Sequence, residues 1–404
     1  MPTLKLTPAE LRLTFDPATL GFADTSEMLD YQLPWIGQER AEMASRFGLE
    51  MEQPDYNLFV LGEVGSGRSS LLKRAMQTAA TNRPVPPDLC YLHNFDAPEH
   101  PRALRLPAGQ GRLLRQLMAQ MMKSLQTEIP QRLDGQEFKA ESEHIENSYK
   151  TQETTAYAEL DAFAEVRKFT LHRDSGHMVF TYRGDEGHTL TEIEVLALPK
   201  ELRTQIEQTE QELRTEISRY FEKTRSMERV RDEALATLRR QIVRPLLDHE
   251  LQEIRAGLKK QIKDSVKLGT YLEQVVHDVL ENLELFKALD TDDDIRQEAL
   301  GTVLSRYRVN LVVDNGGLTG APVIVEDNPL FRALFGSIEY QSENDVLVTD
   351  FSRIRAGSLH KAHGGYLMLH LRDLLVMAWY GKSCGACCAA AGCRSKSRAP
   401  RSLL

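Results

Sequence analysis

Apolar residues form short runs in the first part of the chain, and polar turns separate them. Residues 58–61 (Leu-Phe-Val-Leu) predict a strand that leads into a glycine-rich turn, and residues 69–76 predict the helix that follows it. Residues 88–95 and 104–106 predict two more strands, and residues 113–129 predict a helix. This alternation of strands and helices indicates an α/β layer with a parallel sheet.

The middle of the chain has a different pattern. Residues 169–172 and 177–182 alternate apolar and polar side chains on either side of a turn, which predicts a β-hairpin. From about residue 199 to 285 the sequence is charged, with apolar residues at helical spacing. These residues recur every seven positions or lie on the same helical side: Ile206, Leu213, Tyr220 and Met227, with Leu202 and Ile217. The spacing predicts a long helix that packs along one apolar seam.

Pro245 is expected to break or kink this helical run, because proline has no backbone N–H to donate. Two further helical faces are predicted beyond it, at Leu251, Ile254, Leu258 and Ile262, and at Tyr271, Leu272, Val275, Val276, Val279 and Leu283. A solvated helical insertion with one core face accounts for these patterns. Periodicity alone assigns the insertion no function.

The last part of the chain returns to α/β patterning. Strands are predicted at residues 307–314, 322–327 and 366–369, and a helix at 330–335. The organisation that follows is a first α/β part at 1–130, an insertion at 131–290 with a hairpin at about 168–183, the rest of the α/β module at 291–378, and a tail at 379–404.

Length and composition are those of a folded protein of two or three domains, with 404 residues of which 41% are hydrophobic and 27% charged. The net charge of −9 argues against nucleic acid as the main partner. The chain has no apolar run of about 18 residues that would span a membrane, and its first residues lack the apolar core of a signal peptide. We therefore expect a soluble, cytoplasmic protein without a nucleic-acid or membrane partner.

Four of the five cysteines crowd the end of the chain, at Cys384, Cys387, Cys388 and Cys393, whereas Cys90 lies alone in a predicted strand and is interpreted as a core residue. The Cys-x-x-Cys spacing also fits a metal or redox site, but no histidine or second spaced pair follows it. A disordered tail is a second interpretation. The abrupt change to Cys, Ala, Arg and Ser favours a third, that residues 379–404 are a non-native translation out of frame.

The glycine-rich turn after residue 61 has the spacing of a phosphate-binding loop, G-x-x-x-x-G-K-[ST], with one departure. In that motif backbone N–H groups surround the phosphates, the lysine reaches the β and γ phosphates, and the hydroxyl holds Mg²⁺. The candidate nucleotide-binding residues are Gly62, Gly65, Ser66, Gly67, Arg68, Ser69 and Ser70. Arg68 stands at the lysine position, and its wide planar fork is a poor substitute for a compact ammonium. ATP or ADP is a possible ligand, and Mg²⁺ would follow only if nucleotide binds. The alternative is an ordinary glycine turn between a strand and a helix.

Four segments together resemble the Lon-like AAA+ serine proteases, in particular a bacterial branch with a large insertion in the ATPase-like module. They are Ile36-Gly37-Gln38, which corresponds to the adenine contact of AAA+ proteins, the loop at 62–69, residues 328–340 (Asn-Pro-Leu-Phe-Arg-Ala-Leu-Phe-Gly-Ser-Ile-Glu-Tyr), and residues 347–351 with 360–367 (His-Lys-Ala-His-Gly-Gly-Tyr-Leu). The resemblance covers most of residues 5–378. It implies a P-loop AAA+-like parallel sheet with a large inserted helical region, and adds Ile36, Gly37 and Gln38 to the candidate nucleotide site.

The resemblance also shows a second departure. In related proteins the strand after His-Lys-Ala-x-Gly-Gly closes with Asp-Glu, which holds Mg²⁺ and activates water. His370 and Leu371 occupy these positions here, and loss of general-base chemistry costs about 10² to 10⁴ in rate. Asp373 comes three residues later and would lie roughly 10 Å further along an extended strand. ATP turnover is therefore not expected.

The family's peptidase activity belongs to a further domain with a Ser/Lys pair, and Ser358, Ser383 and Ser395 lack the Gly-Pro-Ser-Ala-Gly setting that it requires. The expectation is a substrate-gating, ATPase-like region of a Lon-like serine protease acting on unfolded proteins, truncated before the protease domain, without catalytic residues of its own. The resemblance implies a homo-oligomeric ring, commonly sixfold. The alternatives are an active AAA+ nucleotidase and a non-enzymatic scaffold that binds partner proteins through its helices.

Overall fold

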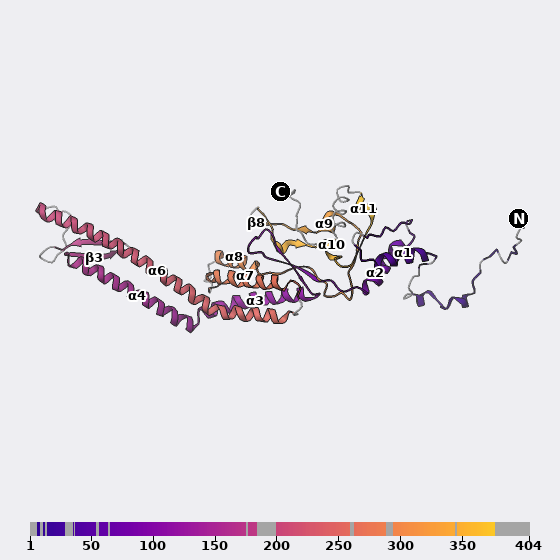
Figure 1. Cartoon of the computed structure of the whole chain (residues 1–404), viewed down its shortest axis with the longest axis horizontal. Helices are drawn as coiled ribbons and strands as arrows, with labels where there is room; N and C mark the ends of the chain where they lie inside the picture. The colour runs from indigo at the N-terminus through magenta and orange to yellow at the C-terminus, as the bar shows by residue number, and fades with distance from the viewer. Residues whose placement is uncertain are drawn as a thin grey trace. The chain divides into compact units, whose positions relative to one another are not determined.

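The computed structural model describes residues 6–8, 11–12, 14–28, 35, 37–53, 56–63, 65–174, 177–183, 199–258, 262–287, 294–343 and 346–375 (Figure 1). The chain divides into two compact units. Unit 1 comprises Met1–Pro86, Gly317–Ser337 and Arg355–Leu404, and unit 2 comprises Pro87–Gly316 and Ile338–Ile354. The cysteine-rich tail lies outside the described residues, so the out-of-frame interpretation stays a prediction.

Unit 1 contains two longer helices and a pair of parallel strands. Its elements are the short helices η1 (Pro17–Leu20) and η2 (Thr25–Met28), then α1 (Glu39–Glu50), α2 (Arg68–Thr81), β6 (Val323–Glu326), α9 (Phe331–Phe335), α10 (Ser358–Lys361), β11 (Tyr366–Leu369) and α11 (Leu371–Leu375). Strands β6 and β11 pair in parallel, from Val323 opposite Tyr366 to Glu326 opposite Leu369. The predicted helices at α2 and α9 and the predicted strands at β6 and β11 are confirmed.

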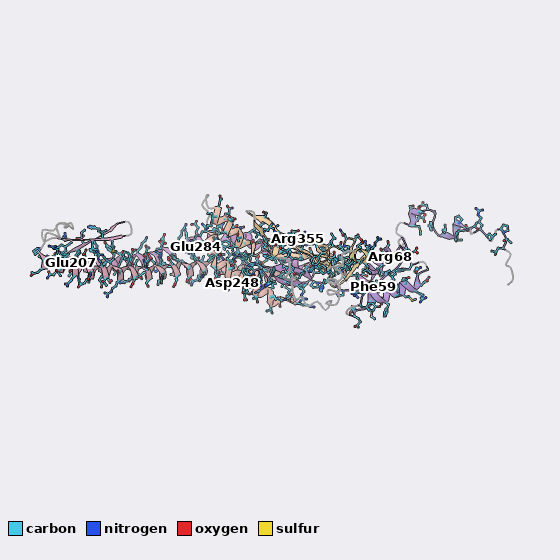
Figure 2. All side chains as sticks on the ribbon, turned by 90° about the horizontal axis from the view of Figure 1, so that it is seen from above. Phe59, Arg68, Glu207, Asp248, Glu284 and Arg355 are labelled. Atoms are coloured by element: carbon cyan, nitrogen blue, oxygen red, sulfur yellow. The ribbon has the colours of Figure 1, made fainter. Side chains whose placement is uncertain are left out.

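The strand predicted at residues 58–61 is not formed, and this is a correction. The side chains of Phe59 and Leu61 are 73% and 91% exposed (Figure 2), while Leu58 packs so closely on α1 that a Cβ built at Gly48 would lie 2.2 Å from its Cδ2. A strand is stabilised by hydrogen bonds to a neighbour. Among the described strands none pairs with this segment, so its apolar character alone does not make it a strand.

Unit 2 begins with a three-stranded sheet in the order β2-β1-β5, formed by β1 (Asp88–Leu92), β2 (Arg102–Leu106) and β5 (Asn310–Val313). Strand β1 pairs antiparallel with both neighbours, with Cys90 opposite Leu104 and Leu311. The strands are present as predicted, but a parallel sheet in the first part of the chain is wrong. The connection between β1 and β2 is short, and a short connection joins antiparallel strands, because a parallel pair needs a crossover of a dozen or more residues.

A long two-helix arm forms much of unit 2 (Figure 1). Helix α4 (Gln136–Glu165) leads to the hairpin β3 (Phe169–Asp174) and β4 (His177–Tyr182), and α6 (Lys200–Gly257) follows. The helices are antiparallel, as the side-chain contacts Arg167 to Glu212, Lys223 to Glu159 and Tyr149 to Glu228 show at 3.2, 3.0 and 3.3 Å. The hairpin is confirmed, and it pairs antiparallel from Phe169 opposite Tyr182.

The apolar seam of the arm is confirmed with one exception. Ile206, Leu213 and Tyr220 are buried, and they pack in one cluster with the hairpin residues Phe169 and Leu171. Leu202 was predicted on the same seam, but 42% of its side chain is exposed. The seam is buried only from Ile206 onward. Helical spacing therefore predicts the correct face of the helix but extends the buried seam one turn too far, to Leu202.

Pro245 does not break α6, which continues through it to Gly257. A proline inside a helix costs about 3 kcal/mol or more. Its neighbours Val243, Leu246 and Leu247 are 0%, 2% and 1% exposed, and burial of side chains of this size stabilises the helix by roughly 1.5 to 3 kcal/mol each. Packing of the helix therefore outweighs the loss of one hydrogen bond.

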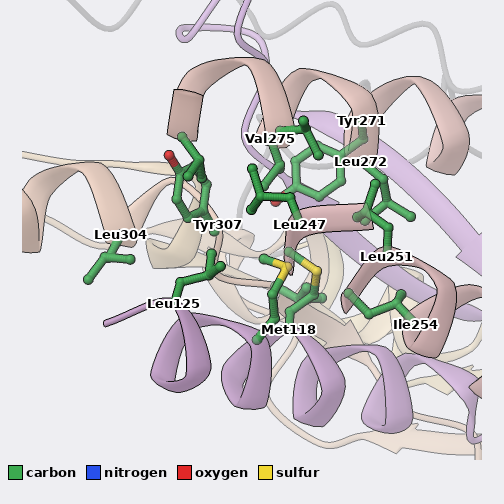
Figure 3. Close-up of a cluster of buried hydrophobic side chains, with 14 of the residues drawn as sticks. Met118, Leu125, Leu247, Leu251, Ile254, Tyr271, Leu272, Val275, Leu304 and Tyr307 are labelled. Atoms are coloured by element: carbon green, nitrogen blue, oxygen red, sulfur yellow. The ribbon is translucent and has the colours of Figure 1, made fainter. Parts of the chain in front are cut away.

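The main core of unit 2 joins the sheet to four helices. Helices α3 (Gln110–Leu133), α7 (Ser265–Glu281) and α8 (Asp294–Ser305), the short η3 (Leu283–Phe286) and the C-terminal part of α6 contribute to it. Met118 of α3, Leu251 of α6 and Tyr271 of α7 point toward one another (Figure 3). The face predicted on α6 is confirmed at Leu251 and Ile254, which are buried, but α6 ends at Gly257 and the partly buried Ile262 is not helical. The second predicted face is buried, with Leu283 in η3 and its other residues in α7. Cys90 is fully buried in this core, as predicted.

The remaining elements are short. Strands β8 (Gln341–Glu343) and β9 (Val346–Val348) pair antiparallel, η4 (Phe351–Arg353) follows, and β7 (Ser337–Ile338) pairs with β10 (Ile354–Arg355). No helix in the described part of the chain combines the length and apolar character that a membrane span needs.

Candidate functional site

The glycine-rich loop of unit 1 turns at two glycines and leads into α2. Gly65 and Gly67 have φ angles of 88° and 75°, in the left-handed region that glycine adopts most readily. Gly67 is the N-cap of α2, and its carbonyl accepts the backbone N–H of Leu71 at 3.0 Å. The loop therefore leads directly into a helix whose N-terminus carries a partial positive charge.

Arg68 does not extend away from this loop. Its Nη1 donates a hydrogen bond to the backbone carbonyl of Gly62, so the side chain spans the loop from end to start (Figure 2 labels Arg68). A Cβ built at Gly62 would lie 3.1 Å from Ser66 Oγ and 3.6 Å from Arg68 Cδ. The side chains of Ser66 and Arg68 thus lie over Gly62. Ser69 and Ser70 lie in the first turn of α2, with Ser69 partly buried and Ser70 exposed.

The predicted adenine-side residues lie before α1. Gly37 has a φ of 66°, and Gln38 is the N-cap of α1, without a hydrogen bond from its side chain to the helix. Ile36 lies outside the described residues. The other end of α1 is fixed to the strand pair, because the carbonyl of Leu49 accepts hydrogen bonds from Tyr366 Oη at 2.7 Å and from Arg83 Nη2 at 3.0 Å.

Arg83 also stacks over the ring of Tyr366, with Cζ 4.7 Å from the ring centroid. Burial raises the pKa of the Tyr366 hydroxyl above its usual 10, so it stays protonated and donates to Leu49 at neutral pH. This connection positions α1 beside β11 within unit 1.

The positions that would carry acids in a nucleotide hydrolase lie at the end of β11. His370 follows the strand, and its Nε2 lies 3.9 Å from Oδ1 of Asp327. Leu371 begins α11, and its side chain is 46% exposed. Asp373 lies in the first turn of α11, so the chain beyond the strand is helical and not extended as assumed from the sequence. The aligned positions offer an imidazole and an isobutyl group to a ligand in place of carboxylates.

The last residue of the neighbouring strand β6 is a carboxylate, Glu326, but protein groups are hydrogen-bonded to it. Glu326 accepts the backbone N–H of Asn328 at 3.2 Å on Oε1 and the hydroxyl of Ser358 on Oε2. Ser358 is 5% exposed, which is the setting of a structural hydroxyl and not of a free nucleophile. Among the described residues no group of three or more His, Cys, Asp and Glu is arranged to hold a metal ion.

The His-Lys-Ala-His-Gly-Gly segment has a structural role that sequence reasoning missed. Gly364 has a φ of 77°, and a Cβ built at Gly365 would lie 2.0 Å from the carbonyl oxygen of Pro322. The N–H of Tyr366 donates to the same carbonyl at 2.8 Å. The two glycines allow the chain to leave α10, turn and begin β11 directly beside β6. A glycine pair just before an apolar run is the sequence signal of such a close approach.

Together, a glycine loop before a helix, a parallel strand pair and a long helical region define an α/β ATPase-type module with a helical insertion. Residues 319–381 match a family model described as LonB-like, AAA domain, and residues 88–121 match one described as Lon-like LonC helical domain. Two segments of the chain are thus similar to Lon-like proteins. A comparison with curated proteins gives no match. The glycine-rich loop lies outside both matched segments, and its role in nucleotide binding stays a prediction.

In this structure the arrangement of the glycine-rich loop and of the residues after β11 does not fit bound ATP. A bound nucleotide would need the phosphate loop free and a carboxylate near Mg²⁺, whereas Arg68 is hydrogen-bonded across the loop and His370 and Leu371 stand at the acidic positions.

Proposed function

We propose that this chain is the substrate-gating, ATPase-type region of a Lon-like serine protease, that it acts on unfolded proteins, and that it works without hydrolysing ATP. The observation that carries the proposal is a long two-helix arm in the same chain as a nucleotide loop closed by its own arginine. Similarity to Lon-like proteins supports protein substrates and a ring of identical subunits, commonly six. ATP or ADP, with Mg²⁺, would bind at Gly62–Ser70 only after Arg68 leaves Gly62.

The end of the arm offers apolar side chains to an unfolded chain. Val166 at the end of α4, Val179 on β4 and Leu202 in the first turn of α6 are 82%, 49% and 42% exposed. Exposed apolar groups bind other apolar groups without regard to sequence, since burial yields roughly 25 cal/mol per Å². Such contacts suit a partner whose own apolar side chains are exposed, as those of an unfolded protein are.

The test is binding of a permanently unfolded protein. Reduced, carboxymethylated α-lactalbumin with a fluorescent label is titrated with the full chain, and anisotropy is measured with and without Mg²⁺-ATP. We expect saturable binding whose affinity is the same in both conditions, and no binding of the disulfide-intact, folded form. Replacing Val179 and Leu202 together by serine should weaken binding about thirtyfold, because each loses about 1 kcal/mol of apolar contact.

The matched control is Val230→Ser, which changes a 63% exposed valine elsewhere on α6. It should leave the affinity unchanged. Binding that requires ATP, or that the Val230 variant weakens as much as the double variant does, contradicts the proposal. ATP hydrolysis by the wild-type chain would favour the nucleotidase alternative.

A further inference from the structure

Arg68 occupies an unusual electrostatic position. It is the first residue of α2, and the helix also carries Lys73 and Arg74 but no acidic residue in its first turn. A positive side chain at a helix N-terminus is repelled by the partial charge of the helix, where an anion would be attracted. A guanidinium here is favoured only when an electronegative group meets it.

The structure provides this group from the loop itself. The carbonyl of Gly62, six residues earlier, accepts the guanidinium N–H of Arg68. Because Gly62 has no side chain, Arg68 Cδ and Ser66 Oγ can lie 3.6 and 3.1 Å from where its Cβ would be. The guanidinium group of arginine is planar and wide and carries five N–H donors. When it lies across the loop, it occupies more of the space above Gly62 than the ammonium group of a lysine would.

We infer that Arg68 is an internal tether of its own loop: its guanidinium binds the carbonyl of Gly62, holds the loop closed and thereby blocks nucleotide phosphates. This inference rests on the proposed nucleotide-independent function and gives it a physical cause. Gly65 and Gly67 shape the turn that Arg68 spans. In this position Arg68 excludes nucleotide phosphates from the turn.

The first measurement is hydrogen exchange of the loop. If the contact tethers the loop, Arg68→Ala should raise the exchange rate of the backbone amides in residues 62–70 about tenfold, which corresponds to about 1.4 kcal/mol of lost protection. Arg74→Ala removes the same side chain from the same helix beyond the loop, and should leave the exchange of residues 62–70 as in the wild type. Equal exchange in wild type and Arg68→Ala overturns the inference.

The second measurement is binding of a fluorescent ATP analogue with Mg²⁺. Arg68→Lys keeps the positive charge and removes the fork, so it should bind the analogue at least about tenfold more tightly than the wild type does. Arg74→Lys is the matched control and should bind as the wild type does. If Arg68→Lys gains nothing, or the control gains as much, Arg68 does not block the binding of nucleotide phosphates.

The two proposals fail in different ways. If the wild type binds ATP poorly and Arg68→Lys binds no better, the inference is wrong while nucleotide-independent function stands. If the wild-type chain itself binds and hydrolyses ATP, the proposed function fails first, and the closed loop fails with it.

Discussion

The buried carboxylate of Asp88 joins three segments of unit 2, and its replacement should destabilise the unit strongly. Asp88 is 0% exposed and begins β1. Its Oδ2 accepts the N–H of Gly111 in the first turn of α3 at 2.9 Å, and its Oδ1 accepts the N–H of Asn315 after β5 at 2.8 Å. The side-chain amide of Asn315 donates to the carbonyl of Pro87 at 3.0 Å. One side chain thus fixes a helix start and a loop against the sheet.

The expected loss follows from these two hydrogen bonds. A hydrogen bond to a charged group contributes roughly 1.5 to 3 kcal/mol, and a buried donor left unpaired adds to the cost. Asp88→Ala leaves both N–H groups buried without acceptors, so we predict a loss of about 3 to 5 kcal/mol. Asp88→Asn keeps one acceptor and places an NH₂ group against the other N–H, so it should lose about half as much. Either loss is large beside a typical total of about 5 to 15 kcal/mol.

Cys90 provides a local probe of this loss. Its side chain is fully buried two residues from Asp88, and burial, with the charge of Asp88 as a second cause, raises the pKa of its thiol to about 12. At pH 8 the native thiol is therefore protonated and inaccessible, and only opening of unit 2 exposes it to a disulfide reagent. The assay uses a background in which the four tail cysteines are replaced by serine, and follows Cys90 labelling across a urea series.

With a slope of about 2 kcal/mol per molar urea, Asp88→Ala should lower the midpoint of Cys90 labelling by about 2 M. The control is Asp232→Asn, which removes an exposed carboxylate on α6 that pairs with Arg231, and should shift the midpoint by less than about 0.5 M. If Asp88→Ala labels with the wild-type midpoint, the carboxylate does not join the three segments energetically.

Two further changes test unit 1. Gly365→Ala should destabilise it by about 1 to 3 kcal/mol, because the new Cβ would lie 2.0 Å from the carbonyl oxygen of Pro322. Urea unfolding measures this loss. The control is Gly317→Ala, where a Cβ meets nothing within 4 Å, and it should cost far less. The second concerns pH: burial, and then the charge of His363, lowers the pKa of His360 below 6.5. The unfolded chain therefore binds this proton first, and stability falls as pH drops below about 6.5 toward the folded pKa. His360→Gln should lose less stability between pH 7 and 5 than the wild type, and an equal loss would show that His360 is not responsible.

Helices were predicted well from the sequence, because the information that defines them is local. The seven-residue spacing of Ile206, Leu213 and Tyr220 identifies the buried face of α6 without knowledge of what covers it. Pro245 was expected to break or kink the helix, and the break does not occur. Whether a helix continues through a proline depends on tertiary packing around it, here the buried Val243 and Leu246, which the proline's own sequence context does not reveal.

Strand pairing depended on partners far away in the sequence, and it was predicted less well. Cys90 lies opposite Leu311, more than two hundred positions later, and no local pattern specifies that neighbour or its antiparallel direction. The apolar segment at residues 58–61 shows the reverse case. It has strand-forming residues, yet no described strand pairs with it, because strand propensity measures how well side chains fit a sheet that other segments must provide.

The candidate site shows the same limit at the level of side chains. Motif spacing located the glycine loop and marked Arg68 as a departure, and the resemblance to Lon-like proteins marked His370 as a second one. Neither could show that Arg68 turns back to Gly62, or that Glu326 is bound by Ser358. These contacts depend on backbone directions that emerge only when the loop and the strand pair are folded.

The division of the chain explains why the Lon-like matches and the compact units do not coincide. The AAA-type match at 319–381 runs from unit 1 into unit 2 and back, since residues 338–354 belong to unit 2. Asn310 of β5 fixes part of this excursion, because its Nδ2 donates to the carbonyls of Phe351 and Ile354 at 2.7 and 3.0 Å. A piece of the ATPase-type sequence is therefore part of the unit that carries the arm. Neither unit is one continuous stretch of chain, so the arm and the glycine-rich loop require the full chain for study.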